Sequence, residues 1–355
     1  MKKVSRRELL KRLAAGAGAL TVQQILAACS PQNTPLPTQG VDRTTLPSTP
    51  AATSKPSSPA TTAPTDTIEI APTETNPPQP SPTPTPFDLV VVRNAEPDAL
   101  VRKAIEAFGG IEKFIKQGAK VIIKPNICVS YHTYEYAATT NPWVVGTLVK
   151  MCFEAGASSV RVMDQPFGGT ARDAYAKSGI EAQVKANGGE MVSMVGYKYV
   201  PADMPLGKDL KKTVLYDEIL KADAVINVPI AKTHDLARVT LAMKNLMGVI
   251  DDRVGMHRNL GQRLADLCTL IRPTLNVMDA VRILTAHGPS GGNLDDVKKL
   301  DTVIVSQDIV AIDSYTASFF DMVPQELTYV IAGTAMKIGR SDLKNLNIQE
   351  INLGA

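Results

Sequence analysis

Six short runs of apolar residues, with amphipathic helical segments between them, constrain the fold more than any other feature of the chain. They lie at 88–92, 119–124, 158–164, 223–229, 274–279 and 301–306. Runs that are apolar almost throughout are typical of strands buried on both faces of a parallel sheet. The sequence therefore predicts an α/β fold, a mostly parallel sheet with helices on both faces, with room for a smaller sub-lobe.

Amphipathic segments between these runs predict the covering helices. The clearest begins at Asn141, which can cap a helix, continues with Pro142, which suits the first helical position, and ends near Gly156. Two further segments, 258–273 and 307–320, show the same helical spacing of apolar residues. Strands and helices that alternate in this way indicate βαβ units.

The first 86 residues differ in kind from the rest and predict an export signal followed by a tether. Arg6 and Arg7 precede a short apolar stretch, which is typical of a cleaved twin-arginine signal covering residues 1–28. The stretch is too short for a permanent membrane span, which needs about 20 apolar residues. Leu26-Ala27-Ala28-Cys29 resembles a bacterial lipobox, which implies that a lipid on Cys29 anchors the protein to a membrane.

Residues 29–86 form the expected tether, and residues 87–355 the folded domain. Fifteen of the 25 prolines lie in the tether, among Thr, Ser and Ala, a composition that cannot offset the entropy of ordering. The domain organisation places the protein outside the cytoplasm, lipid-anchored on the outer face of the cytoplasmic membrane or in the cell envelope.

Charge and cysteine content exclude two classes of function. The whole chain has a formal charge of +3, but the signal carries six Lys and Arg against one Glu, and the tether four acidic against two basic residues. The domain is therefore neutral and lacks the basic footprint of a nucleic-acid binder. Cys128, Cys152 and Cys268 show no C-x-x-C spacing, which argues against an iron–sulfur cluster held by this chain alone. Three buried thiols are favoured over one disulfide and one free thiol.

Polar side chains follow the apolar runs where each strand would end. The carboxyl ends of parallel strands share the edge at which open α/β sheets bind ligands, so we expect these side chains to converge there. Lys244 and Asn245, on a following amphipathic helix, would face the same cleft. The expected ligand contacts are Lys124, Asn126, Asn141, Asp164, Lys244 and Asn245. Asp279, Asp308 and Asp313 also follow strands, although a strand-end hydrogen bond for Asp279 and a helix cap for Asp308 fit equally well.

Lys232 and His234 are the expected catalytic residues. A lysine at the start of a helix opposes the helix macrodipole, so the position predicted for Lys232 indicates an anionic group nearby. Histidine titrates near neutral pH, so His234 suits proton transfer. A metal site is the alternative, because imidazole binds zinc, nickel, copper and iron. Its candidate ligands are His234, His257, His287 and Asp279.

Several segments, taken in order, resemble one protein family. They are "KPNI" (124–127), "TTNPWVV" (139–145), "EAGASSVRVMD" (154–164), "INVPIAKTH" (226–234), "LAMKNLMGVI" (241–250), "MHRNLGQRLADL" (256–267), "VMDAVRILTAHGPSGG" (277–292) and "SQDIVAIDSYTASFF" (306–320). This series resembles the bacterial and archaeal family called domain of unknown function 362. The resemblance implies a fold more than an activity, and the ferredoxin-like module of some members has no counterpart in these cysteines.

A more distant similarity is to nickel-pincer lactate racemases, which set a histidine and a lysine around an anionic cofactor. That similarity implies a comparable part for His234 and Lys244.

Two hypotheses of function follow. In one, the domain is an enzyme that acts on a small anionic molecule and uses a metal, a redox group or an organic anion as cofactor, with a redox protein as partner. In the other, it is a solute-binding lipoprotein that delivers an anionic molecule to a transporter without catalysis.

Overall fold

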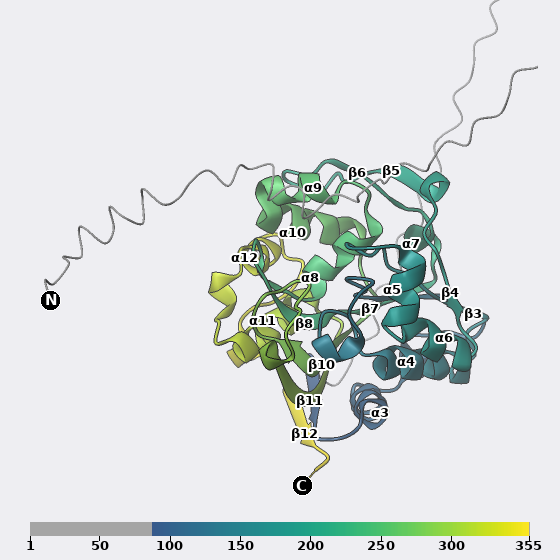
Figure 1. Ribbon diagram of the computed structural model, residues 1–355. Helices are drawn as coiled ribbons and strands as arrows, with labels where there is room; N and C mark the ends of the chain where they lie inside the picture. The colour runs from purple at the N-terminus through teal and green to yellow at the C-terminus, as the bar shows by residue number, and fades with distance from the viewer. Residues whose placement is uncertain (1–86, 355) are drawn as a thin grey trace, which may run out of the picture. The chain divides into compact units, whose positions relative to one another are not determined.

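The computed structural model describes residues 87–354, and a ten-stranded sheet forms its centre (Figure 1). The expected export signal, Cys29 and tether lie outside these residues. Across the sheet the strands are β12 (Ile348–Asn352), β1 (Leu89–Arg93), β11 (Val297–Ser306), β10 (Leu275–Leu284), β7 (Ala224–Val228), β2 (Lys120–Pro125), β3 (Ser159–Val162) and β4 (Glu190–Met191), with β8 (Ile230–His234) beside β10 and β9 (Arg238–Thr240) beside β8.

The sheet is mostly parallel, as predicted, and β11 is the exception within the path from β12 to β4. It runs antiparallel to both of its neighbours, β1 and β10. Asp308 therefore lies beyond the opposite edge of the sheet, where it caps the helix α11 (Ile309–Ala317) by accepting the Val310 and Ala311 N–H groups, each at 2.9 Å. Of the two interpretations offered for Asp308, the helix cap is confirmed. Asp308 does not join the other strand-end groups, because an apolar run does not encode strand direction.

Helices cover both faces of the sheet (Figure 1). One layer contains α3 (Pro97–Ala107), α4 (Pro142–Glu154), α5 (Ala171–Lys177) and α6 (Ile180–Ala186), and the other contains α8 (Ala242–Asn245), α10 (Leu260–Leu270), α11 and α12 (Thr328–Ala335). Successive residues of β1 alternate between the two layers: Val90 and Val92 pack in the core under α3 and α4, and Leu89 and Val91 in the other. Both faces are therefore buried, as the unbroken apolar runs predicted.

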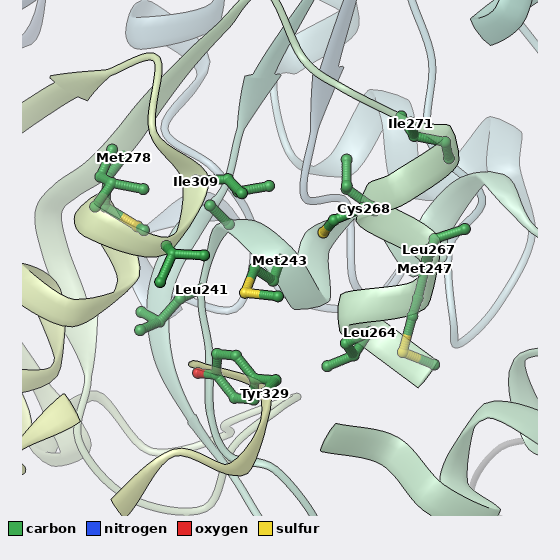
Figure 2. Packing of buried hydrophobic residues seen from close by; sticks show 14 of the residues in the cluster. Leu241, Met243, Met247, Leu264, Leu267, Cys268, Ile271, Met278, Ile309 and Tyr329 are labelled. Atoms are coloured by element: carbon green, nitrogen blue, oxygen red, sulfur yellow. The ribbon is translucent and has the colours of Figure 1, made fainter. Parts of the chain in front are cut away.

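The hydrophobic core between the sheet and the layer of α8, α10, α11 and α12 holds α8 in place. Met243 of α8 packs near Leu264 and Cys268 of α10 and Tyr329 of α12 (Figure 2). Asp313, which is fully buried on α11, accepts the Ala242 N–H at 2.6 Å and the Met243 N–H at 3.0 Å. A four-residue helix is not stable by itself. Asp313 thus holds the start of α8 through backbone hydrogen bonds. It does not line the cleft at the strand ends, where the sequence suggested that it lies among the polar groups.

After β7 the chain continues almost directly into another strand of the sheet, β8. Pro229 separates β7 from β8, and β8 then pairs with the second half of β10 and with β9. Within the β8–β9 hairpin, Lys232 lies opposite Thr240, and His234 opposite Arg238. Lys232 is therefore a strand residue and not the first residue of a helix, which removes the macrodipole argument for it. Lys232 and His234, two apart on one strand, point to the same side.

Two smaller features complete the fold. A separate two-stranded sheet, β5 (Tyr199–Asp203) with β6 (Lys212–Tyr216), packs on the same hydrophobic core as α8 and α10 and belongs to the same compact unit as the ten-stranded sheet, so it does not form a separate sub-lobe. The short helix α7 (Glu218–Lys221) follows β6, and α9 (Arg253–Met256) lies further along the chain. Within 87–354, no helix combines the length and apolar character that a membrane span needs.

Candidate functional site

A cavity of about 450 Å³ lies at the carboxyl ends of the central parallel strands. Its walls come from the loops after β2 and β3, the β8–β9 hairpin, α8 and the start of α9. Eight residues singled out from the sequence line it: Lys124, Asn126, Asp164, Lys232, His234, Lys244, Asn245 and His257. The parallel strands thus bring together residues that lie up to 133 positions apart in the chain.

The floor of the cavity is a buried ion pair. Lys124 Nζ lies 2.8 Å from Asp164 Oδ1, and both side chains are almost fully buried. Asp164 Oδ2 also accepts the Ile127 N–H at 2.6 Å. Burial lowers the pKa of Lys124, and the carboxylate of Asp164 opposes that shift. The two charges of the pair neutralise each other, and the contacts of Asp164 with Lys124 and Ile127 connect the loop after β2 to the end of β3.

A series of hydrogen-bonded asparagine side chains connects this ion pair to neighbouring strands. Asn245 Oδ1 accepts from Lys124 Nζ and from Asn126 Nδ2, both at 3.0 Å. Asn245 Nδ2 donates to Asn227 Oδ1 at 2.8 Å, and Asn227 Nδ2 donates to Asn276 Oδ1 at 3.0 Å. Satisfied buried polar networks of this kind are rigid. The network fixes the position of α8 against β2, β7 and β10.

Gly248 closes the floor of the cavity. A Cβ atom at this position would lie 1.8 Å from Asp164 Oδ1 and 2.6 Å from Lys124 Nζ. The backbone approaches the ion pair so closely that a side chain does not fit, and the Gly248 carbonyl accepts the Gln165 N–H at 3.1 Å. This is a close-approach glycine, which the sequence pattern did not reveal.

Lys232 is a structural ammonium in the wall of the cavity. Its Nζ donates to Asn126 Oδ1 at 2.9 Å, to Ala138 O at 2.6 Å and to Pro289 O at 3.0 Å. Three acceptors occupy the three N–H groups that an ammonium possesses. Burial lowers the pKa of Lys232. Its positive charge acts within the cavity, although its three N–H groups already donate to acceptors of the protein.

His234 faces the cavity as a neutral imidazole. Its Nδ1 accepts the Leu236 N–H at 3.1 Å and the Ala237 N–H at 3.4 Å, so the ring proton is on Nε2. Burial, followed by the charges of Lys244 and Lys232, lowers the pKa of His234 to about 2. The sequence-based expectation of a pKa near neutrality does not hold in this setting, because burial and the neighbouring positive charges both disfavour the protonated ring.

Two buried polar atoms beside His234 have no hydrogen-bond partner within residues 87–354. They are His257 Nε2 and Thr240 Oγ1, and both residues line the cavity. Backbone groups of Arg253 and Val254 bond the His257 ring, but burial and the charge of Lys244 lower its pKa. Buried polar atoms without a partner are rare, and at a cavity wall they are candidate ligand contacts.

Two expected site residues are used for structure instead. Asn141 caps α4 by accepting the Trp143 N–H at 3.0 Å, as its position before Pro142 suggested. Asp279 accepts the Asn141 N–H at 2.6 Å and the Val281 N–H at 3.0 Å. Burial raises the pKa of Asp279 to about 6. Neither residue lines the cavity, because β10 continues to Leu284 and leaves Asp279 in the middle of a strand.

The four candidate metal ligands do not meet, which corrects the metal-site hypothesis. His234 and His257 are neighbours, with ring centroids 6.5 Å apart. His287 is exposed and its Nδ1 lies 2.7 Å from Asp296 Oδ2, which raises the pKa of His287. Across residues 87–354, no group of three or more His, Cys, Asp or Glu side chains is arranged to hold a metal.

The structure adds residues that the sequence did not single out. Arg253 lines the cavity, and its guanidinium donates to Gln165 O at 3.0 Å and to Pro166 O at 3.3 Å. Cys128 also lines the cavity, whereas the sequence suggested only a buried thiol. Its position four residues after Lys124, in the loop that follows β2, was the available signal.

Comparison with known proteins gives one family match. The family model described as "Domain of unknown function (DUF362)" matches residues 121–318, more than half of the chain. The "Thylakoid-associated protein sll1697" of Synechocystis sp. is 26% identical over 243 residues, which cover 66% of this chain and 73% of that protein.

Two solved structures show weaker similarity. The lactate racemase apoprotein from Thermoanaerobacterium thermosaccharolyticum aligns with a TM-score of 0.37 and 11% identity, over 60% of this chain and 53% of that one. A protein from Thermotoga maritima aligns with a TM-score of 0.33 and 12% identity, over 64% and 59%. The chain thus spans less than two thirds of the length of either.

Replacing Gly248 should break the floor of the cavity. We expect Gly248→Ala to lower the free energy of unfolding by roughly 3 kcal/mol, because the methyl group forces the Lys124–Asp164 pair apart. Gly196→Ala is the matched control, since a Cβ there meets no atom within 4 Å. Urea denaturation measures both, and equal stability of the two variants would contradict this account of the floor.

The depressed pKa of His234 predicts a pH dependence of stability. The unfolded chain protonates this residue below about pH 6.5, whereas the folded protein does not until about pH 2, so stability falls as the pH drops through this range. The slope from this group is up to about 1.4 kcal/mol per pH unit. His234→Asn, which keeps an acceptor for the Leu236 N–H, should lose less stability between pH 7 and pH 5.

Urea denaturation at several pH values provides the measurement. His287→Asn is the control, because the raised pKa of His287 has the opposite sign: its contribution is present at low pH and is lost as the pH rises. An unchanged pH dependence in His234→Asn would show that His234 is not held neutral.

Proposed function

We propose a function from the premise that this chain belongs to the DUF362 family, whose description states no activity: the domain binds a small organic anion in the cavity at the carboxyl ends of its parallel strands. The balance of charge supports the proposal. Four cationic side chains line the cavity, Lys124, Lys232, Lys244 and Arg253, against two carboxylates, Asp164 and Asp235. One carboxylate is paired with Lys124, and Asp235 is exposed.

The observation that carries the proposal is the position of Lys244 beside two imidazoles. Lys244 is only 8% exposed, and its charge lowers the pKa of both His234 and His257. Cationic side chains outnumber carboxylates in this lining, so the charge of Lys244 would attract an anion bound beside it. The Nε2–H of His234 and the Thr240 hydroxyl are hydrogen-bond donors available to the same anion.

The rest of the lining favours an organic molecule over an inorganic ion. Ile127, Phe167, Leu236, Met247 and Pro289 supply an apolar wall. The volume of the cavity and the chemistry of its lining match sites for small ligands, which combine apolar walls with a few placed polar groups. The ligand class is therefore an anion with an apolar or aromatic body, either a carboxylate or a phosphate.

Catalysis by this site would depend on the ligand. In the enzyme hypothesis, the negative charge of the substrate raises the pKa of His234 and His257 toward the range in which histidine transfers protons. The alternative is solute binding without catalysis. One observation favours it: the neutral His234, fixed as an Nε2–H donor, suits recognition of a ligand without proton transfer.

Binding of aromatic anions tests the proposal. Phenyl phosphate and benzoate should bind, and Lys244→Met should weaken their affinity about tenfold, as expected for the loss of one charge-assisted contact. Lys150→Met, an exposed lysine on α4, should have no effect. Isothermal titration calorimetry measures each affinity. Neutral benzamide bound as tightly as benzoate, or no binding of either anion, would contradict the proposal.

We also propose that the domain works outside the cytoplasm, tethered through lipid on Cys29. The support is the order of twin arginines, lipobox and proline-rich segment in the sequence, and a related protein is named for its association with thylakoids. Its partner would be a redox protein or a transporter in the same membrane, depending on whether the domain is an enzyme or a solute-binding protein.

Lipid labelling tests this location. Cells fed alkyne-tagged palmitate should incorporate label into the wild-type protein and into Cys128→Ser, but not into Cys29→Ser, which should leave the membrane fraction. Arg6→Lys with Arg7→Lys should retain the precursor in the cytoplasm. Equal labelling of Cys29→Ser and wild type would show that Cys29 is not the anchor.

A further inference from the structure

Cys128 differs from the other two cysteines of the described residues in its surroundings. Cys152 and Cys268 are buried among apolar side chains, and burial raises the pKa of Cys152 to about 12 and raises that of Cys268 as well. Cys128 lies in the wall of the anion cavity, 5% exposed. The two buried thiols serve as internal standards against which the reactivity of Cys128 is measured.

The Cys128 thiol lies next to the Lys232 ammonium. Cys128 Sγ donates to Pro289 O at 3.4 Å, and Lys232 Nζ donates to the same oxygen at 3.0 Å. The backbone fixes the cysteine from both sides, since its N–H donates to Thr139 Oγ1 at 3.0 Å and its carbonyl accepts the Phe167 N–H at 2.9 Å. A shared acceptor and a rigid backbone hold sulfur and ammonium side by side.

Among residues 87–354, no hydrogen-bonded carboxylate offsets the charge of Lys232 beside Cys128, because the hydrogen-bond acceptors of Lys232 are neutral. Its three N–H groups point to an asparagine oxygen and two backbone carbonyls, and none of these carries a charge. Thiolates form beside cations, and the thiolate is the reactive form of cysteine. Thr240, opposite Lys232 on β9 and 4% exposed, adds a hydroxyl without a partner to the same cavity wall.

We propose that Cys128 is a nucleophile of this site and that its substrate is an organic anion with an electrophilic carbonyl carbon. The inference rests on the proposed anion binding and adds the reacting group. The sulfur electron pair forms the S–C bond, the π pair of the carbonyl moves to its oxygen, and the proton lost by the thiol ends on that oxygen. The product is a thiohemiacetal, and no further reactant is required.

Alkylation of the full-length protein tests the inference. The probes are iodoacetate, an anion with an electrophilic carbon, and its neutral analogue iodoacetamide; in each reaction an S–C bond forms, iodide leaves, and the thiol proton passes to solvent. Peptide mapping by mass spectrometry reads each cysteine separately. At pH 7, Cys128 should react before Cys152 and Cys268. Its rate ratio of iodoacetate to iodoacetamide should exceed that of glutathione about tenfold, because the cavity attracts the anion.

Variants and a competitor separate the two parts of the proposal. Lys232→Met should slow alkylation of Cys128 about tenfold, as expected for loss of the stabilising charge, and Lys150→Met should not. Glyoxylate, a carboxylate with an aldehyde carbon, should protect Cys128 better than acetate, which has the same charge and no electrophilic carbon. If Lys232→Met does not fold by circular dichroism, the wild-type rate ratio and the glyoxylate protection decide.

Each outcome bears on a different claim. Alkylation of Cys128 no faster than that of Cys152 and Cys268 would overturn the nucleophile, whereas binding of phenyl phosphate would still support the proposed function. Fast alkylation without preference for iodoacetate, and without protection by glyoxylate, would overturn the anionic carbonyl substrate and leave the reactive thiol established.

Discussion

The buried pair of Lys124 and Asp164 is the interaction on which the rest of the site depends. It joins the ends of two adjacent parallel strands at 2.8 Å, and almost no water reaches it. Removing one partner of such a pair typically costs about 3–5 kcal/mol, because the other charge is left buried alone. Asn245 bonds the lysine, and Gly248 covers the carboxylate, so α8 and the loop after it are positioned by the same pair.

This pair also sets the electrical character of the cavity. Since Lys124 and Asp164 neutralise each other, the other charges of the lining belong to Lys232, Lys244 and Arg253 and to one carboxylate, the exposed Asp235. Burial, and after it the charge of Lys244, lowers the pKa of both His234 and His257 and favours their neutral forms. We propose that this excess of positive charge, together with the apolar wall, selects for an organic anion.

Much of the sheet could be predicted, because burial on both faces leaves a clear sequence signal. The six apolar runs correspond to β1, β2, β3, β7, β10 and β11, and Asn141 caps α4 as expected. Strand direction leaves no such signal, so the antiparallel β11 was not foreseen, and the sequence left open whether Asp308 caps a helix or joins the other strand-end groups. The sequence does not show strand length clearly either: β10 continues past Asp279, so this residue lies in the core and not at the end of a strand.

The candidate site was predictable only where neighbouring strands are parallel. Lys124, Asp164 and Lys232 converge because β2, β3 and β7 share one direction, and β8 continues from β7. Gly248 gave no pattern of its own, and Cys128 gave only its position four residues after Lys124, since the roles of both arise from what surrounds them in space. Arg253 lies in a short helix whose position is set by its bonds to the loop after β3, and the sequence does not specify that contact.

Anomalous diffraction from crystals soaked in bromide or rubidium would test the central claim, that this cavity is built for an anion. The account predicts a bromide ion inside the cavity beside Lys244 and His234, and no rubidium there. Rubidium in the cavity, or bromide found only at exposed lysines, would contradict it.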